Sequence, residues 1–363
     1  MRKFYVPLIG VSVLVFSLIA FYIFRGGLIL DEKRVVSNLF QVSQGGPEAS
    51  LPTLAIESLR QREYPGSDIV VEQRLADSSN YKRYIASYKS DGLKIFGLLT
   101  IPNGEQPKGG WPAIVFNHGY LPPSQYVTTQ RYEAYLDGFA KRGYVVFKSD
   151  YRGHGNSQGI ATGNYFSPGY AVDVLNALAS IKRLKNPSTG PSTGSSGSIV
   201  NADRIGMWGH SMGGNITMRN LVLSDDIKAA VIWAGVVGSY EDILNNWSRA
   251  RRWQVASAEH RHQGPSRQNF LDEFGTYEEN LDFWKSIDPY TYLEDIDTPV
   301  QLHHGTGDIH VPLSFSEGFK KALEKEGKSV ELYTYDGADH NLSGAAFGLA
   351  MARSVEFFDK YLK

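Results

Sequence analysis

The sequence contains no cysteine, carries almost no net charge and has only one long hydrophobic run. Without cysteine the chain can form no disulfide, offer no thiolate nucleophile and build no cysteine-ligated zinc site. The formal net charge is −1 at pH 7, which gives no overall attraction to polyanions, so a nucleic-acid partner is not expected. The 363 residues, of which 42% are hydrophobic, are enough for one large α/β domain with appendages.

The one long hydrophobic run covers residues 4–24. About 21 residues in helical conformation cross a hydrocarbon core of about 30 Å, so residues 1–25 are predicted to be an N-terminal transmembrane helix that anchors the protein. A cleaved signal peptide is the alternative, although the run exceeds the usual apolar region of about 7 to 15 residues and no small-x-small cleavage site follows. Lys and Arg nearly balance across the run, and we expect a single-pass protein with its bulk outside the cytoplasm.

Residues 26–80 contain scattered Gly and Pro and are predicted to form a stalk or leader. Residues 81–363 are predicted to form the folded domain, which opens with an antiparallel pair joined at Asp91-Gly92. Strands and helices then alternate along the chain, and this alternation predicts a mostly parallel central sheet with helices on both faces. The expected strands are 81–89, 93–101, 113–117, 144–148, 205–210, 228–237, 299–304 and 330–335, and the expected helices are 129–142, 169–185, 215–223, 314–326 and 344–362.

Two segments interrupt the alternation. Residues 186–198 are rich in Ser, Gly, Thr and Pro and are predicted to be a flexible surface loop without a function. Residues 238–287 form an insertion of about fifty residues, longer than connections in compact domains usually run. This insertion is rich in aromatic and basic residues. It is expected to be a helical cap over a functional site, with a helical decoration that has a solvated basic face as the alternative.

A short apolar run ends in Gly209-His210-Ser211-Met212-Gly213. The Gly-x-Ser-x-Gly pattern between a buried strand and a helix is typical of a sharp turn that exposes its serine as a nucleophile. The flanking glycines allow strand and helix to approach closely. Ser211 is therefore predicted to be catalytic, and a glycine-rich loop without a catalytic role is the alternative.

A serine nucleophile needs a histidine base, which in turn needs a carboxylate to fix its tautomer. Asp308 follows the strand 299–304 and His340 follows the strand 330–335, which gives the chain order Ser, Asp, His. Both lie where the carboxyl ends of parallel strands meet. Asp336 and Asp339 are alternative acids, but residues so close to His340 more readily cap or turn its loop.

Donors for a developing oxyanion are expected from two places. One is the backbone N–H of Met212, and the other is Tyr120, through its N–H or its hydroxyl. Three further histidines flank Asp308 and superficially suggest a metal cluster: His303, His304 and His310. The first two are adjacent on a strand and point to opposite faces, so structural roles are expected, with no metal and no cofactor. His210 is expected to pack beneath the turn that carries Ser211.

Together these motifs resemble the hydrolase domain of the prolyl oligopeptidase (S9-type) branch of the α/β-hydrolases. The motifs that carry the resemblance are 118–120, 150–155, 209–214, 304–308 and 339–340. The resemblance implies an α/β-hydrolase fold with Ser211 as nucleophile, Asp308 as acid and His340 as base, and with Met212 and Tyr120 at the oxyanion hole. It also implies a structural role for Arg152 and His154.

Large members of that branch carry a β-propeller, and the segment before residue 81 is too short for one. Glu278-Glu279 is the one pair of adjacent glutamates in the insertion and the candidate there for holding a peptide amino terminus, but a helix-start role fits it better. The sequence therefore predicts a serine hydrolase that acts on a small ester or a short peptide. The alternatives are a catalytically silent binding module and an acyltransferase that uses the same three residues. The oligomeric state is left open.

Overall fold

The computed structural model describes residues 53–161, 165–187, 197–247 and 267–363. Residues 54–363 belong to one compact unit. Within the described ranges no helix is both long and apolar enough to cross a bilayer. The predicted anchor, residues 1–25, and residues 26–52 of the predicted stalk lie outside these ranges.

One nine-stranded sheet organises the compact unit, in the order β1-β2-β3-β5-β4-β6-β7-β8-β9. The strands are β1 (Val70–Arg74), β2 (Tyr81–Ser90), β3 (Leu93–Pro102), β4 (Trp111–Asn117), β5 (Val145–Ser149), β6 (Val200–His210), β7 (Ala229–Trp233), β8 (Val300–Gly305) and β9 (Val330–Tyr335). The first three strands and β5 pair antiparallel, and the pairs from β5 through β4, β6, β7 and β8 to β9 are parallel. The prediction of a mostly parallel central sheet is therefore confirmed.

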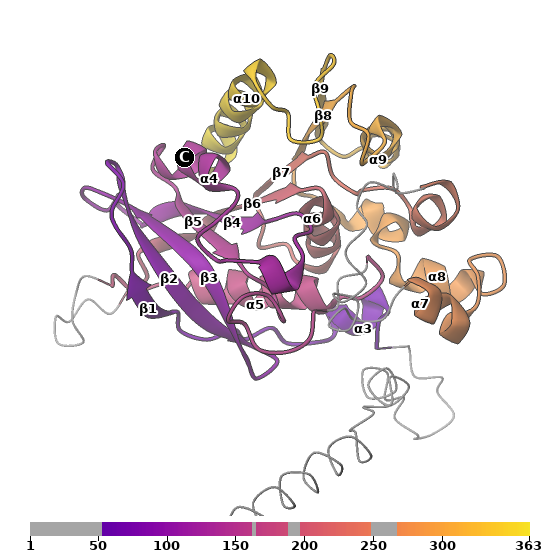
Figure 1. Cartoon of the computed structure of the whole chain (residues 1–363), viewed down its shortest axis with the longest axis horizontal. Helices are drawn as coiled ribbons and strands as arrows, with labels where there is room; N and C mark the ends of the chain where they lie inside the picture. Colours follow the sequence, from indigo (N-terminus) through magenta and orange to yellow (C-terminus); the bar gives the residue numbers. More distant parts are fainter. Residues whose placement is uncertain (1–52, 162–164, 188–196, 248–266) are drawn as a thin grey trace, which may run out of the picture. The chain divides into compact units, whose positions relative to one another are not determined.

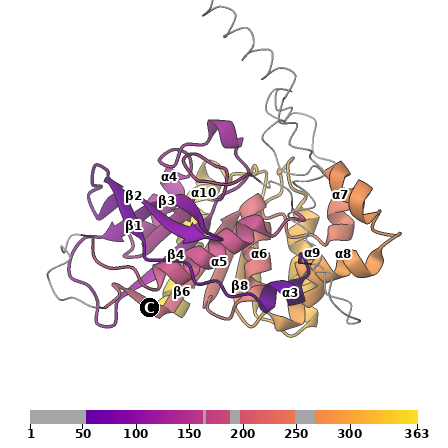
Figure 2. The same cartoon turned by 90° about the horizontal axis from the view of Figure 1, so that it is seen from below.

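Helices cover both faces of this sheet (Figures 1 and 2). The pair α4 (Glu133–Ala140) and α10 (Ala345–Leu362) packs on one face against strands that include β5 and β6. The other face is covered by α5 (Gly169–Ile181), α6 (Met212–Leu223) and α9 (Leu313–Lys325). α4 begins later than the sequence predicted, because Arg131 and Tyr132 have φ values of 61° and 60°, which a right-handed helix does not allow.

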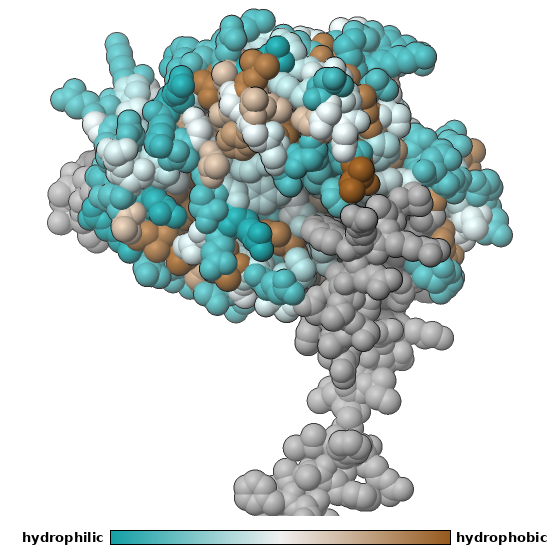
Figure 3. Space-filling model, turned by 45° about the horizontal axis from the view of Figure 1, so that its top comes forward, coloured by the Kyte–Doolittle hydropathy of each residue, from teal (hydrophilic) through white to brown (hydrophobic). Residues whose placement is uncertain are grey.

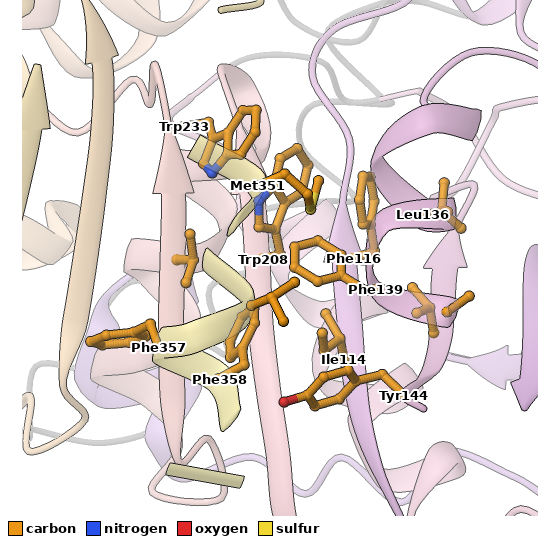
Figure 4. Packing of buried hydrophobic residues seen from close by; sticks show 14 of the residues in the cluster. Ile114, Phe116, Leu136, Phe139, Tyr144, Trp208, Trp233, Met351, Phe357 and Phe358 are labelled. Atoms are coloured by element: carbon orange, nitrogen blue, oxygen red, sulfur yellow. The ribbon is translucent and has the colours of Figure 1, made fainter. Parts of the chain in front are cut away.

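A cluster of buried side chains fills the space between the sheet and the helices α4 and α10 (Figure 4). Trp208 of β6 lies at its centre, with Phe116 stacked on it at 4.2 Å between ring centroids. Gly206 leaves room for Phe358 of α10, because a Cβ at this glycine would lie 2.6 Å from that ring. Alternate residues of β6, namely 206, 208 and 210, thus face α4 and α10.

Residues 54–80 pack within the compact unit, although the sequence placed them in a stalk or leader. The short helix α3 (Ile56–Arg60) buries Ile56 and Leu59 and contacts α6. β1 extends the sheet by pairing with β2, but all five of its side chains are exposed. A strand with no buried face leaves no period-two hydrophobic pattern, so the sequence carries no signal for it.

The insertion at 238–287 is described in part. Its elements are a π-helical turn η2 (Asp242–Asn246), α7 (Arg267–Phe274) and α8 (Leu281–Ile287), followed by η4 (Pro289–Asp295). Trp284 is fully buried and packs edge-on against Phe166 at 5.2 Å between ring centroids. The insertion is therefore anchored by an aromatic contact. Residues 248–266, which hold most of its basic side chains, and residues 188–196 of the predicted flexible loop lie outside the described ranges.

The face shown in Figure 3 is mostly hydrophilic, with hydrophobic residues scattered singly or in small groups. Such scattering is ordinary for a folded surface. The large hydrophobic side chains that are exposed in the described ranges are Val70, Val71, Val127, Ile160, Leu281, Ile309 and Leu349.

Candidate active site

Ser211 lies at the junction of β6 and α6, in a backbone conformation that few residues adopt. Its φ is 56° and its ψ is −118°, values outside the regions that side-chain-bearing residues favour. The turn is held by hydrogen bonds from the Ser211 N–H to the Trp233 carbonyl at 3.1 Å and from the Val236 N–H to the Ser211 carbonyl at 3.0 Å. The neighbouring strand β7 and its following loop therefore fix the strained serine at the carboxyl edge of the sheet.

The two glycines that flank Ser211 in the motif are required by close packing. A Cβ at Gly209 would lie 2.4 Å from the Gly213 carbonyl oxygen, and a Cβ at Gly213 would lie 2.0 Å from the Asn117 carbonyl oxygen. Both obstructing atoms are backbone atoms, so neither can move without shifting a strand or a helix. The sharp turn thus depends on the absence of side chains at these positions.

Replacing Gly213 by alanine is expected to destabilise the fold by about 3 kcal/mol, because β4 and α6 must separate to admit the methyl group. Gly348 is the matched control: it is exposed near the start of α10, and a Cβ added there would meet nothing within 4 Å. Gly348→Ala is expected to stabilise the protein by about 0.5–1 kcal/mol. Thermal unfolding of both variants measures the difference, and equal melting temperatures would contradict the packing account.

Asp308 and His340 meet at the same edge of the sheet. Asp308 follows β8 and His340 follows β9, and the His340 Nδ1 lies 2.7 Å from the Asp308 Oδ2. Because Nδ1 is engaged by the carboxylate, Nε2 is the ring nitrogen left to act as a base. His340 is also close to the nucleophile in space, since its carbonyl oxygen lies 3.0 Å from the Nε2 of His210, the residue before Ser211. No hydrogen bond joins Ser211 Oγ to His340 within the described ranges; in unliganded enzymes this contact is often long.

The Asp308 carboxylate is fully buried and accepts hydrogen bonds at both oxygens. Oδ1 accepts from the N–H groups of His310 at 2.8 Å and Val311 at 3.0 Å. Oδ2 lies 3.2 Å from the Nε2 of His304 in addition to its contact with His340. Burial acts to raise the pKa of Asp308, but the hydrogen bonds from His304 and His340 and the N–H of Val311 outweigh it and hold the pKa well below its usual range.

The alternative acids have other roles in the structure. Asp339 Oδ1 accepts the N–H groups of Asn341 at 3.1 Å and Ser343 at 2.8 Å, so it caps the loop that carries His340. Asp336 Oδ1 accepts the hydroxyl of Thr306 at 3.1 Å on the exposed surface. Of the three carboxylates, Asp308 is the one that pairs with His340.

Candidate oxyanion donors lie on both sides of Ser211. Met212 is the first residue of α6, and the first N–H groups of a helix have no partner within the helix. The loop after β4 passes beside the serine, because a Cβ at Gly119 would lie 3.2 Å from the Ser211 Cβ. Gly119 donates its own N–H to the Tyr132 hydroxyl at 2.8 Å. Tyr120, which follows it and is half-buried, is thus placed next to the nucleophile.

His303 and His304 point to opposite faces of β8, as their adjacency predicts. His303 Nδ1 is 2.7 Å from the Tyr335 hydroxyl on one face, whereas His304 Nδ1 is 2.7 Å from the Ser316 hydroxyl on the other. Within the described ranges no three His, Cys, Asp or Glu side chains gather in a way that could hold a metal ion. His304 is a buried donor to Asp308, a specific contact that the sequence pattern did not reveal.

Two family-derived expectations concern residues outside this centre. Arg152 forms an ion pair with the buried Asp173, with 2.7 Å between Nη2 and Oδ1, so its role is structural. Glu279 Oε2 accepts the Thr276 N–H at 2.8 Å, and Glu278 Oε1 accepts from Asn245 at 2.7 Å. The acidic pair is thus used within the insertion itself.

Comparison with known proteins finds similarity to the family that the sequence motifs resemble, the S9-type hydrolases. A model of the prolyl oligopeptidase family matches residues 193–363, and one of the X-Pro dipeptidyl-peptidase (S15) family matches residues 91–246. Two curated relatives are the uncharacterized peptidases YuxL and YtmA of Bacillus subtilis. YuxL is 27% identical over 260 residues, which cover 70% of this chain and 34% of YuxL. YtmA is 25% identical over 274 residues, which cover 75% of this chain and 91% of YtmA.

Solved structures of the same fold include peptidases and esterases. An acylaminoacyl peptidase in complex with Z-Gly-Gly-Phe-chloromethyl ketone aligns with a TM-score of 0.59 at 22% identity, over 78% of this chain and 42% of that one. The acetyl xylan esterase from Paenibacillus sp. R4 aligns with a TM-score of 0.56 at 19% identity, over 85% of this chain and 92% of the esterase. The chain thus spans about a third of YuxL and less than half of the acylaminoacyl peptidase.

The sheet order, the family models and the structural neighbours agree, and the predicted resemblance to the S9-type hydrolase domain is confirmed. The described ranges contain one sheet with its helices and no β-propeller. The described part of this chain therefore has the α/β-hydrolase fold and is similar in sequence to the hydrolase domain of the S9-type family.

Proposed function

We propose that this protein hydrolyses an ester or a short-peptide amide through an acyl-enzyme formed on Ser211. The observation that carries the proposal is the part-buried Asp308–His340 hydrogen bond of 2.7 Å at the sheet edge where the strained Ser211 lies. The peptidase and esterase neighbours support both substrate classes.

In the proposed reaction the Ser211 Oγ attacks the carbonyl carbon while His340 Nε2 takes the hydroxyl proton. Asp308 remains ionised and stabilises the imidazolium that forms. The N–H of Met212 and a donor of Tyr120 stabilise the negative charge on the carbonyl oxygen. His340 then gives its proton to the departing alcohol or amine. A water molecule then attacks the acyl carbon while His340 takes its proton, and His340 passes this proton to the Ser211 Oγ as the acid leaves.

A panel of acyl esters, aminoacyl amides and prolyl amides tests this proposal. We expect the wild-type protein to hydrolyse at least one of these three substrate classes. Comparing kcat/KM between esters and amides then shows which class it prefers. Failure on all three classes, together with no covalent labelling by a fluorophosphonate, would refute the proposal.

We also propose that residues 1–25 anchor the protein in a membrane, with the hydrolase domain outside the cytoplasm. The support is the hydrophobic run at 4–24 in the sequence. A variant that begins at residue 26 is expected to leave the membrane fraction while keeping its hydrolase activity. Retention of this variant in the membrane fraction would argue against the anchor.

A further inference from the structure

A continuous chain of hydrogen bonds runs behind Ser211 from the oxyanion loop to the catalytic histidine. The Gly119 N–H lies 2.8 Å from the Tyr132 hydroxyl oxygen. The same hydroxyl lies 2.8 Å from the His210 Nδ1, and the His210 Nε2 lies 3.0 Å from the His340 carbonyl oxygen. These four residues come from the β4 loop, the segment before α4, the end of β6 and the loop after β9.

The chemistry of the two ends fixes the protons along this chain. The His340 carbonyl can only accept, so His210 must carry its proton on Nε2. Burial and the neighbouring His340 lower the pKa of His210 to about 3, so the ring is neutral and its Nδ1 can only accept. The Tyr132 hydroxyl therefore donates to Nδ1, and its oxygen accepts the Gly119 N–H. Every donor and acceptor in the chain is used once.

The backbone is arranged to bring the Tyr132 hydroxyl to this place. Arg131 and Tyr132 both have positive φ, at 61° and 60°, a conformation that is unfavourable for residues other than glycine. The Tyr132 ring packs edge-on against Phe116 at 5.6 Å between centroids. A Cβ at position 119 would lie 2.6 Å from the Tyr132 hydroxyl, so Gly119 is needed for the contact. Such strain indicates that the position of this hydroxyl matters.

We propose that Tyr132 and His210 are positioning residues that hold the oxyanion loop and the His340 loop in register on either side of Ser211. The inference rests on the proposed function. Gly119 directly precedes Tyr120, and the His340 carbonyl belongs to the residue whose ring acts as the base. Tyr132 and His210 therefore act through the backbone groups of Gly119 and His340. A shift of about 1 Å in either loop is enough to cost about 10²-fold in rate.

Three variants test the chain. Tyr132→Phe removes one oxygen atom and leaves the ring packing intact. His210→Gln keeps an amide donor near the His340 carbonyl but removes the acceptor for Tyr132, and the third variant combines both changes. Tyr144→Phe is the matched control, because it also loses one hydroxyl hydrogen bond, to Asp359 Oδ1 at 2.6 Å. Tyr144 lies at the amino end of β5, whereas Ser211 lies at the carboxyl edge of the sheet.

We expect Tyr132→Phe to lower kcat by roughly 10- to 100-fold with little change in KM, and Tyr144→Phe to retain wild-type kcat. The double variant is expected to lose no more activity than the more impaired single variant, because both changes break the same chain. Two independent structural defects would multiply instead.

The inference is overturned if Tyr132→Phe keeps more than half of the wild-type kcat, or if the two losses multiply. Should His210→Gln fail to fold, the comparison of Tyr132→Phe with Tyr144→Phe still decides. Fluorophosphonate labelling of the wild-type protein distinguishes a failure of the proposed hydrolase function from a failure of the positioning role of Tyr132 and His210. Its absence would overturn the proposed function itself, whereas normal labelling with an unimpaired Tyr132→Phe would overturn only the role of the chain.

Discussion

Ser211→Ala is expected to lower kcat by about 10⁵- to 10⁶-fold and to abolish covalent labelling by a fluorophosphonate. The reason is that Ser211 occupies the strained turn at the end of β6 and supplies the hydroxyl that attacks the carbonyl carbon in the proposed reaction. Removing the nucleophile of a serine enzyme costs about as much as removing all three catalytic residues, because they act as a unit. Residual activity would come from binding and oxyanion stabilisation alone.

The fold is expected to survive this change. The Ser211 hydroxyl makes no hydrogen bond to a described residue, so its loss leaves no partner unsatisfied. Ser224→Ala, at the other end of α6, is the matched control and should label and turn over substrate as the wild type does. Labelling of Ser211→Ala at the wild-type rate would show that the nucleophile is a different residue.

The positions of the three proposed catalytic residues could be predicted because each is specified locally. A strand followed by a glycine-rich turn places Ser211, and two successive strands place Asp308 and His340 at its level. In a parallel sheet all carboxyl ends meet at one edge, so chain order alone implies proximity. The hydrogen bond between Asp308 and His340 joins two residues whose proximity the order of the strands already predicted.

The supporting contacts could not be predicted, because they depend on packing between distant segments. Tyr132 and His210 are 78 residues apart and meet only because α4 packs on the face of β6 that carries His210. Tyr132 adopts a left-handed backbone conformation. The sequence did not indicate this conformation, because its pattern predicted a continuous helix from residue 129. β1 was missed for a related reason: its side chains are all exposed, so only its backbone pairing defines it.

Asp308→Asn is expected to lower kcat by about 10⁴-fold. The carboxylate accepts four donors: two backbone N–H groups at Oδ1 and two imidazoles at Oδ2. An asparagine replaces one of these two oxygen atoms by an NH₂ group, which is itself a donor. In either orientation of the side chain, this NH₂ group therefore faces two of the four donors. If it faces His340, the ring must accept at Nδ1 and place its proton on Nε2, where it can no longer take the proton of Ser211.

The same change should alter stability in a pH-dependent way. At neutral pH Asp308→Asn places the asparagine NH₂ group opposite N–H donors that the carboxylate accepted. This buried donor without an acceptor lowers the free energy of unfolding by about 1–3 kcal/mol. Because the pKa of Asp308 is lowered in the folded protein, its charge stabilises the fold above the unfolded pKa of about 3.9. That contribution is lost as the pH falls through the folded pKa. The stability gap between wild type and variant is therefore expected to narrow below about pH 4.

Urea unfolding at neutral and acidic pH, together with kcat/KM at neutral pH, measures both effects. Asp336→Asn is the control, since that carboxylate is exposed and contacts only Thr306 Oγ1 among the described residues, and it should retain full activity and stability. A loss of activity with Asp336→Asn that equals the loss with Asp308→Asn would contradict the assignment of the acid. A stability gap that widens at low pH would show instead that the Asp308 carboxyl is protonated in the fold and that its two histidine contacts hold a neutral group.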